Sequence, residues 1–260
     1  MKEDSFARTD FPDNILDSIN ILLLKKFKKY NSQGKSLFCS YMSYGQKYEN
    51  ELLVIGREPS YWPADFSTEE LNYNGPENVF KTKVHYHANS GLDSLCPLQY
   101  VTDLWGDTEN RYKYNTSYNT FLDPLWGCTK EIVMKLGICK NETNWSSYIA
   151  LSYLYKIAYS CNRYLLEKPR KMQFEYCKEM FQLELLKLQP KRVLFLTGMK
   201  YAQDFLELSD CSGMEDCVCP LGEFDYGFHK AQTVVSVHPK KYRRKELVDL
   251  ILAGFKDNQT

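Results

Sequence analysis

Residues 188–198 read LQPKRVLFLTG and hold the clearest strand signal of the chain. Within this stretch, the apolar run from Arg192 to Thr197 begins just after Pro190 and is stopped by Gly198. A short, continuous apolar run between turn signals is typical of a strand that is buried on both faces of a parallel sheet. We therefore take this run as one strand of such a sheet and look outward for its neighbours.

Three further runs have the same character, and helical patterns separate them. The runs are ELLVI at 51–55, SYIALSYLY at 147–155 and TVVSV at 233–237. Apolar residues recur at helical spacing in five segments: 13–30, 121–136, 171–188, 200–208 and 245–255. Strands that alternate with helices predict an α/β protein, here a three-layer α/β/α fold with a central four-stranded parallel sheet.

The chain shows no linker or internal repeat, so the sequence predicts a single domain over residues 1–260. This domain would carry an N-terminal helix at 13–30 and a long aromatic-rich insert at 60–127. The insert is rich in Asn, Gly and Pro, so we expect mostly loops and short helices in it. Residues 209–231 are expected to form a second loop region.

Composition limits the classes of function. The 33 Lys and Arg residues balance the 33 Asp and Glu residues, which excludes a uniformly basic nucleic-acid coat but allows a local basic patch. The N-terminus is charged, no apolar run is long enough to cross a bilayer, and the nine cysteines are scattered. We therefore expect a cytoplasmic protein with free thiols, no membrane contact and a monomeric state.

Several short motifs do not meet the requirements of the sites they resemble. Gly34-Lys35-Ser36 ends like a phosphate-binding loop, but Lys29 stands where that loop needs a glycine. The pair His85 and His87 is better explained as an ordinary loop pair than as a zinc site. Cys211, Cys217 and Cys219 lack the spacing of a zinc finger. The sequence predicts no metal and no cofactor.

Two polar segments follow predicted strands directly. Gly56-Arg57-Glu58-Pro59-Ser60-Tyr61-Trp62 follows the first strand, and His238-Pro239-Lys240-Lys241-Tyr242-Arg243-Arg244-Lys245 follows the last. The carboxyl ends of parallel strands lie at one edge of a sheet, where open α/β sheets bind their ligands. We therefore expect both segments to face one cleft.

The order of these features resembles the uracil-DNA glycosylase superfamily. That superfamily has a motif of the type Gly-Gln-Asp-Pro-Tyr after its first strand and a motif of the type His-Pro-Ser after its last. Between them, a helix leads to a strand that ends in glycine, as in Leu188 to Gly198 here. The resemblance covers residues 50–255. It implies a glycosylase-like fold and hydrolysis of the bond between the sugar and uracil, or another altered base, in DNA.

The resemblance assigns roles to individual residues. Glu58 stands at the position of the catalytic acid of the first motif, with Gly56 and Pro59 matching directly, and His238 and Pro239 match the second motif. Lys240 replaces the usual serine. The stretch Ala150 to Lys156 lacks the Asn that reads the base in the family, and we assign Ser152 and Tyr153 to the base pocket. No cysteines match the ligands of an iron–sulfur cluster.

These residue types suit the implied reaction. A carboxylate at Glu58 would stabilise the positive charge that develops on the sugar, and a neutral His238 would donate a hydrogen bond to the departing base. Arg57 would bind a phosphate or pair with Glu58 and lower its pKa. Tyr61 and Trp62 are candidates for the wall of a base pocket, or else for core packing.

The loop after His238 is the expected nucleic-acid contact. It carries five cations around one ring: Lys240, Lys241, Tyr242, Arg243, Arg244 and Lys245. Cations neutralise phosphates and a ring can wedge between bases. Two other interpretations remain. The chain would bind nucleic acid or a free nucleotide without cleaving it, as the missing Asn suggests, or the aromatic insert would dock a partner protein.

Overall fold

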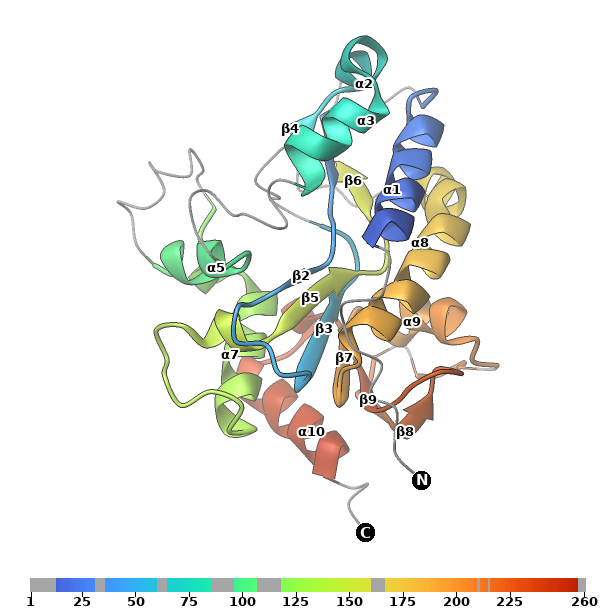
Figure 1. The fold of residues 1–260 in the computed structure, drawn as a ribbon. Coiled ribbons are helices and arrows are strands. Elements are labelled where there is room, and N and C mark those ends of the chain that lie inside the picture. Colours follow the sequence, from blue (N-terminus) through green and yellow to red (C-terminus); the bar gives the residue numbers. More distant parts are fainter. Residues whose placement is uncertain are drawn as a thin grey trace, which may run out of the picture.

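The four predicted strands are neighbours in one sheet. β3 (Leu52–Gly56), β5 (Ala150–Tyr153), β7 (Arg192–Leu196) and β9 (Lys230–Ser236) pair in parallel in the order β5-β3-β7-β9 (Figure 1). This part of the predicted fold is confirmed. The structure is a computed structural model that describes residues 13–30, 36–59, 65–85, 96–106, 118–159, 167–209, 211–214 and 216–256.

The sheet is larger than the sequence predicts. β2 (Ser43–Tyr44) adds antiparallel to β5, and β8 (Cys219–Asp225) adds antiparallel to β9, so the sheet has six strands and is mixed. The prediction of a four-stranded sheet was therefore wrong. β8 escaped notice because it is half exposed and lacks an apolar run, and its register shifts between Pro220 and Gly222.

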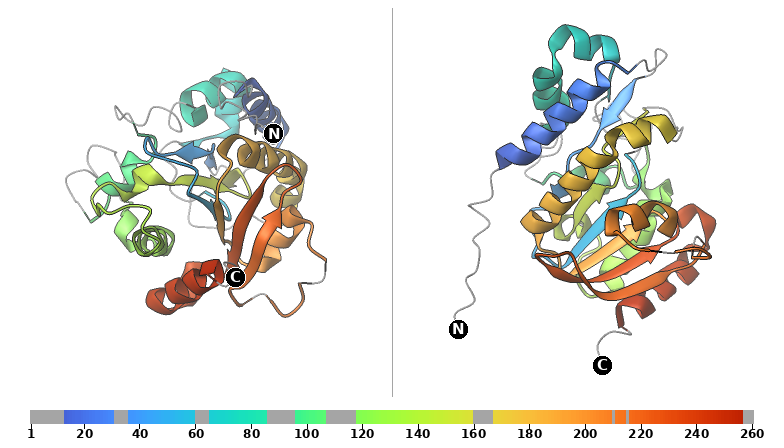
Figure 2. Two further views of the ribbon diagram at one scale, coloured as in Figure 1. Left: turned by 60° about the horizontal axis from the view of Figure 1, so that its bottom comes forward. Right: turned by 90° about the vertical axis from the view of Figure 1, so that its right-hand side faces the viewer.

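Helices cover both faces of this sheet. Phe181 of α8 (Glu167–Leu188) packs on Phe195 of β7, with ring centroids 5.8 Å apart, while Gly254 of α10 (Arg244–Lys256) lies against Val234 of β9. Leu194 pairs with Val234 and Phe195 with Val235, so Phe195 and Val234 point to opposite faces. α9 (Met199–Leu206) packs beside α8 on one face of the sheet, and α7 (Pro124–Lys135) packs beside α10 on the other (Figure 2). We call the two sides the α8 face and the α7 face.

A second, three-stranded antiparallel sheet stands beside the first. It contains β1 (Leu37–Cys39), β4 (Asp65–Phe66) and β6 (Ile157–Tyr159), in the order β4-β1-β6. α1 (Asp13–Phe27), which the sequence predicts at 13–30, packs on α8 (Figure 1). Strands of two or three residues give no sequence period, so this sheet was not predicted.

The described part of the aromatic insert at 60–127 holds several short elements in addition to β4. They are α2 (Thr68–Asn74), α3 (Pro76–Val79), η2 (Phe80–His85), α5 (Gln99–Asp103) and η3 (Thr120–Leu122), followed by the start of α7. Two further 3-10 turns flank strands, namely η4 (Trp145–Tyr148) before β5 and η5 (Pro239–Lys241) after β9. No helix in the described ranges is long and apolar enough to cross a membrane.

Candidate active site at the carboxyl edge of the sheet

The strand order reverses its direction of winding at one point of the sheet. The chain passes from β3 outward to β5, returns to β7 on the other side of β3, and continues to β9. The winding therefore reverses between β3 and β7, which is where open α/β sheets form a ligand crevice. The segment Gly56–Pro59 follows β3, Gly198 follows β7, and His238 follows β9 at a distance of two strand spacings from β3, about 10 Å.

Glu58 is buried and paired with its neighbour. Nη2 of Arg57 lies 3.2 Å from Oε1 of Glu58, and their side chains are 11% and 7% exposed. The backbone here is held by β5, because the amides of Leu154 and Tyr155 donate to the carbonyls of Gly56 and Arg57, each at 2.9 Å. Arg57 was expected either to bind a phosphate or to pair with Glu58, and the structure shows the ion pair with Glu58. The carboxylate of Glu58 therefore lies next to a positive charge.

His238 is held in one neutral form. Its Nδ1 accepts a hydrogen bond from the backbone amide of Lys240 at 3.3 Å, which assigns the ring proton to Nε2. Burial, and then the nearby positive charge of Arg57, lower the pKa of His238 to about 4. At neutral pH the imidazole is therefore uncharged, and Nε2–H is available as a hydrogen-bond donor.

Tyr153 occupies the space beside Gly56. A Cβ atom at Gly56 would lie 2.6 Å from two ring atoms of Tyr153 and 3.4 Å from Leu125 of α7, so only glycine fits there. Tyr153 pairs in register with Gly56 and is buried on the α7 face. Burial, with a smaller effect from Asp123, raises the pKa of its hydroxyl above the usual range. Whether Tyr153 lines a base pocket stays a prediction.

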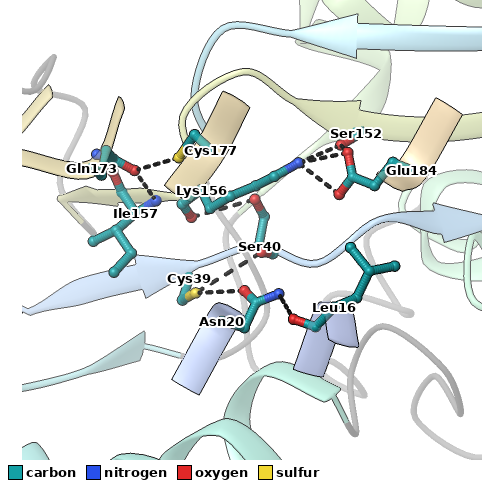
Figure 3. Close-up of polar contacts among 10 residues, drawn as sticks. All are labelled: Leu16, Asn20, Cys39, Ser40, Ser152, Lys156, Ile157, Gln173, Cys177 and Glu184. Carbon is teal, nitrogen blue, oxygen red and sulfur yellow. Dashed lines mark hydrogen bonds and ion pairs between the residues drawn. The ribbon is translucent and has the colours of Figure 1, made fainter. Parts of the chain in front are cut away.

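Ser152 points to the opposite face. Its hydroxyl donates to Oε2 of Glu184 at 2.6 Å, and Nζ of Lys156 donates to both Glu184 oxygens at 2.7 and 2.8 Å and to Ser152 at 2.6 Å. The Lys156 and Glu184 side chains are 1% and 3% exposed. Figure 3 shows this triad beside Cys177, whose pKa burial raises to about 12. The hydroxyl assigned to the base pocket is thus engaged inside the molecule, under α8.

Asp123 is a member of the site that the sequence analysis missed. Its Oδ1 accepts from the amide of Leu125 at 2.9 Å and so caps α7, while its Oδ2 accepts from the Tyr118 hydroxyl at 2.6 Å. That hydroxyl in turn accepts from Nε1 of Trp126 at 2.9 Å. η5, which directly follows His238, packs against α7, whose first turn Asp123 caps, and the negative charge of Asp123 partly opposes the fall in the pKa of His238. An Asp before a Pro is a helix-start signal and could have identified this cap.

Some side chains of the basic loop at 240–245 are held by contacts with the rest of the protein. Lys241 forms an ion pair with Asp216, and the Tyr242 hydroxyl donates to the Asp216 carbonyl at 2.7 Å. Arg244 packs its guanidinium on Gly127 of α7, 3.8 Å from Glu131. The remaining cations, Lys240, Arg243 and Lys245, are exposed, and Arg243 lies 3.8 Å from Glu246. Tyr242 is 38% exposed, so the ring meets solvent while its hydroxyl is held.

Some predicted residues fall elsewhere. Tyr61 and Trp62 lie outside the described residues, as do His87 and the side chain of His85. Within the described ranges no three His, Cys, Asp or Glu side chains are arranged to hold a metal ion. Cys217 and Cys219 have their sulfur atoms 3.4 Å apart, with Cys217 exposed.

Comparison with known proteins does not assign this chain to a family. Neither the protein-family models nor the curated protein sequences contain a match to this chain.

Proposed function

We propose that the protein is a DNA glycosylase-like enzyme that hydrolyses the bond between the deoxyribose and uracil or another altered base. The observation that carries this proposal is the state of His238, a neutral imidazole with its proton fixed on Nε2 at the same sheet edge as Glu58. A neutral donor is what a departing base with growing negative charge on an oxygen requires. The other predicted site residues at this edge are Gly56, Arg57, Pro59 and Tyr153, whereas the hydroxyl of Ser152 is bonded to Glu184 under α8.

In this proposal Glu58 and His238 act on opposite sides of the breaking bond. The carboxylate of Glu58 stabilises the oxocarbenium character of the sugar, and Nε2–H of His238 donates to the base. A water oxygen bonds to C1′ as the C1′–N bond breaks, and one water proton passes to the carboxylate. Arg57 holds that carboxylate in place, because the two groups form a buried ion pair. The exposed cations of the basic loop contact phosphates.

One observation favours the alternative of nucleic-acid or nucleotide binding without cleavage. Tyr153 is 6% exposed and fills the space beside Gly56, where a flipped base would approach the first motif. A base would then bind against the ring without reaching Glu58. The third interpretation, a docking surface on the aromatic insert, has no comparable support.

A glycosylase assay separates the first two functions. The purified protein is incubated with labelled single- and double-stranded oligonucleotides that carry uracil or hypoxanthine, and abasic sites are then cleaved with alkali. Cleavage that Glu58→Gln and His238→Ala both abolish supports the enzyme. Binding without cleavage, lost when Lys240, Arg243 and Lys245 are neutralised, supports the alternative. Cleavage that survives both substitutions overturns the assigned roles.

A further inference from the structure

Two cysteine side chains meet at the start of β8. Sγ of Cys217 lies 3.4 Å from Sγ of Cys219. Both thiols also face the carbonyl of Met214, at 3.3 Å from the Cys217 sulfur and 4.0 Å from the Cys219 sulfur. Among the cysteines of the described ranges, Cys217 is exposed and the others are buried. Cys217 is therefore the thiol that a reagent in solution reaches, and a second thiol lies directly beside it.

The two cysteines differ in how firmly their backbone is held. Cys219 is the first residue of β8 and pairs with Val235 of β9, whereas Cys217 lies in an exposed bend before the strand. A disulfide bond is about 2.05 Å long, so the two sulfur atoms would have to approach by roughly 1.4 Å to form one. We expect Cys217 to make most of this movement, because the pairing with β9 holds Cys219 in place.

The residue before Cys217 holds the basic loop. Asp216 forms an ion pair with Lys241, and its carbonyl accepts a hydrogen bond from the Tyr242 hydroxyl at 2.7 Å. This carbonyl belongs to the peptide bond that joins Asp216 to Cys217, so it moves when the backbone of Cys217 moves. A hydrogen bond is lost beyond about 3.5 Å, so a shift of the carbonyl by about 1 Å would break the contact with Tyr242.

We propose that Cys217 and Cys219 are a thiol–disulfide exchange site, at which a small-molecule disulfide oxidises the pair to an intrachain disulfide and thereby loosens the basic loop. The Cys217 thiolate attacks one sulfur of the small disulfide, and a small thiolate leaves with the electron pair of the broken bond and takes up a proton. The Cys219 sulfur then attacks Cys217 in the mixed disulfide, and the second small thiol leaves with the proton of Cys219. Two protein thiols are oxidised, and one small disulfide is reduced to two thiols.

The surroundings of the pair favour a reversible reaction. Exposed disulfides are reduced more easily than buried structural ones, and a loop closed over the single residue Val218 gains little chain-entropy stabilisation. Burial, and then the hydrogen bond with Cys217, raise the pKa of Cys219 to about 12. Cys219 therefore stays a thiol, and Cys217 attacks first. The inference does not depend on the proposed function, because it concerns only these two thiols and the loop that Asp216 holds.

Peptide mapping tests whether the disulfide forms. The full chain is incubated with an excess of oxidised glutathione, free thiols are alkylated, and the protein is digested with trypsin. Cys211, Cys217 and Cys219 share the peptide 201–230, which should lack two hydrogen atoms and carry no glutathione. Reduced glutathione should restore both thiols. Cys217→Ser and Cys219→Ser should each abolish the internal disulfide, whereas Cys211→Ser is the matched control and should keep it.

Brief trypsin digestion of the folded protein tests the link to the basic loop. Cleavage at 240–245 should be several-fold faster after oxidation, because the loop is released from Asp216. The double variant Cys217→Ser/Cys219→Ser should show no such change with oxidised glutathione. Circular dichroism confirms that each variant is folded.

Three results would overturn this inference. If only a mixed disulfide with glutathione forms on Cys217, or if Cys211→Ser abolishes the internal disulfide, the assigned pair is wrong. If the Cys217–Cys219 disulfide forms but cleavage of the basic loop is unchanged, the link to the loop is wrong. None of these results bears on the glycosylase proposal, which is decided by cleavage of altered bases under reducing conditions.

Discussion

Side chains point alternately to the two faces of the sheet along β5, and this direction determines which neighbours each residue at the site contacts. Ser152 pairs with Ile55 and faces α8, while Tyr153 pairs with Gly56 and faces α7. Two neighbouring residues therefore belong to different layers, one in a buried ion cluster and the other beside the first motif. The alternation also explains why Arg57, one residue after Gly56, reaches Tyr201 on the α8 face.

Gly56→Ala tests the packing of Tyr153. The new methyl group would lie 2.6 Å from the ring, so we expect a loss of about 1–3 kcal/mol in the free energy of unfolding, measured with urea. In a Tyr153→Leu background the same substitution should cost clearly less, because the ring is gone. An equal cost in both backgrounds would show that the ring is not the obstacle.

His238 should make the protein less stable in mild acid. Its folded pKa of about 4 lies below the unfolded value of about 6.5, so between these values only the unfolded chain binds the proton. The contribution of His238 is therefore complete above pH 6.5 and is lost as the pH falls toward 4, by at most about 3 kcal/mol. His238→Gln should lack this loss. Parallel curves of unfolding free energy against pH for both proteins would contradict the lowered pKa.

At the scale of elements, α8 is anchored by a buried ion pair at the end of β5. Lys156→Met should cost about 3–5 kcal/mol in unfolding free energy, because it leaves the Glu184 carboxylate buried without its cation. The double variant Lys156→Met/Glu184→Leu should recover most of this loss, since no buried charge remains. Urea unfolding measures both, and a double variant as unstable as the sum of the single variants would contradict this account.

The strands differ in how well they could be predicted from the sequence. The four central strands were predictable because burial on both faces leaves a continuous apolar run, as in β7. β8 could not be predicted in this way, because exposed polar residues interrupt its apolar sequence. At the site, the strand ends predicted from the sequence put Glu58 and His238 at the same edge of the sheet, as the structure does, while their catalytic roles stay predictions. Contacts such as Arg57 with Tyr201 join residues far apart in sequence, and no local pattern encodes them.

The two sheets should unfold together. Lys156 joins them, since its carbonyl accepts from the Ser40 amide at 2.8 Å beside the small sheet while its Nζ is held under the large one (Figure 3). Trp105, Trp126 and Trp145 lie near one another on the α7 side of the molecule. In a Trp62→Phe variant, their fluorescence and the circular dichroism at 222 nm should therefore change at one denaturant concentration. Two separate transitions would contradict the single-domain prediction.

The two outermost strands of the large sheet have a consequence for association between copies of the chain. A free strand edge is a template on which another chain can pair. Here β2 is two residues long, and β8 has a register shift at Pro220 and exposed carboxylates at Glu223 and Asp225. Each feature discourages the addition of a foreign strand. Both edges of the large sheet therefore disfavour strand-to-strand pairing between copies of the chain.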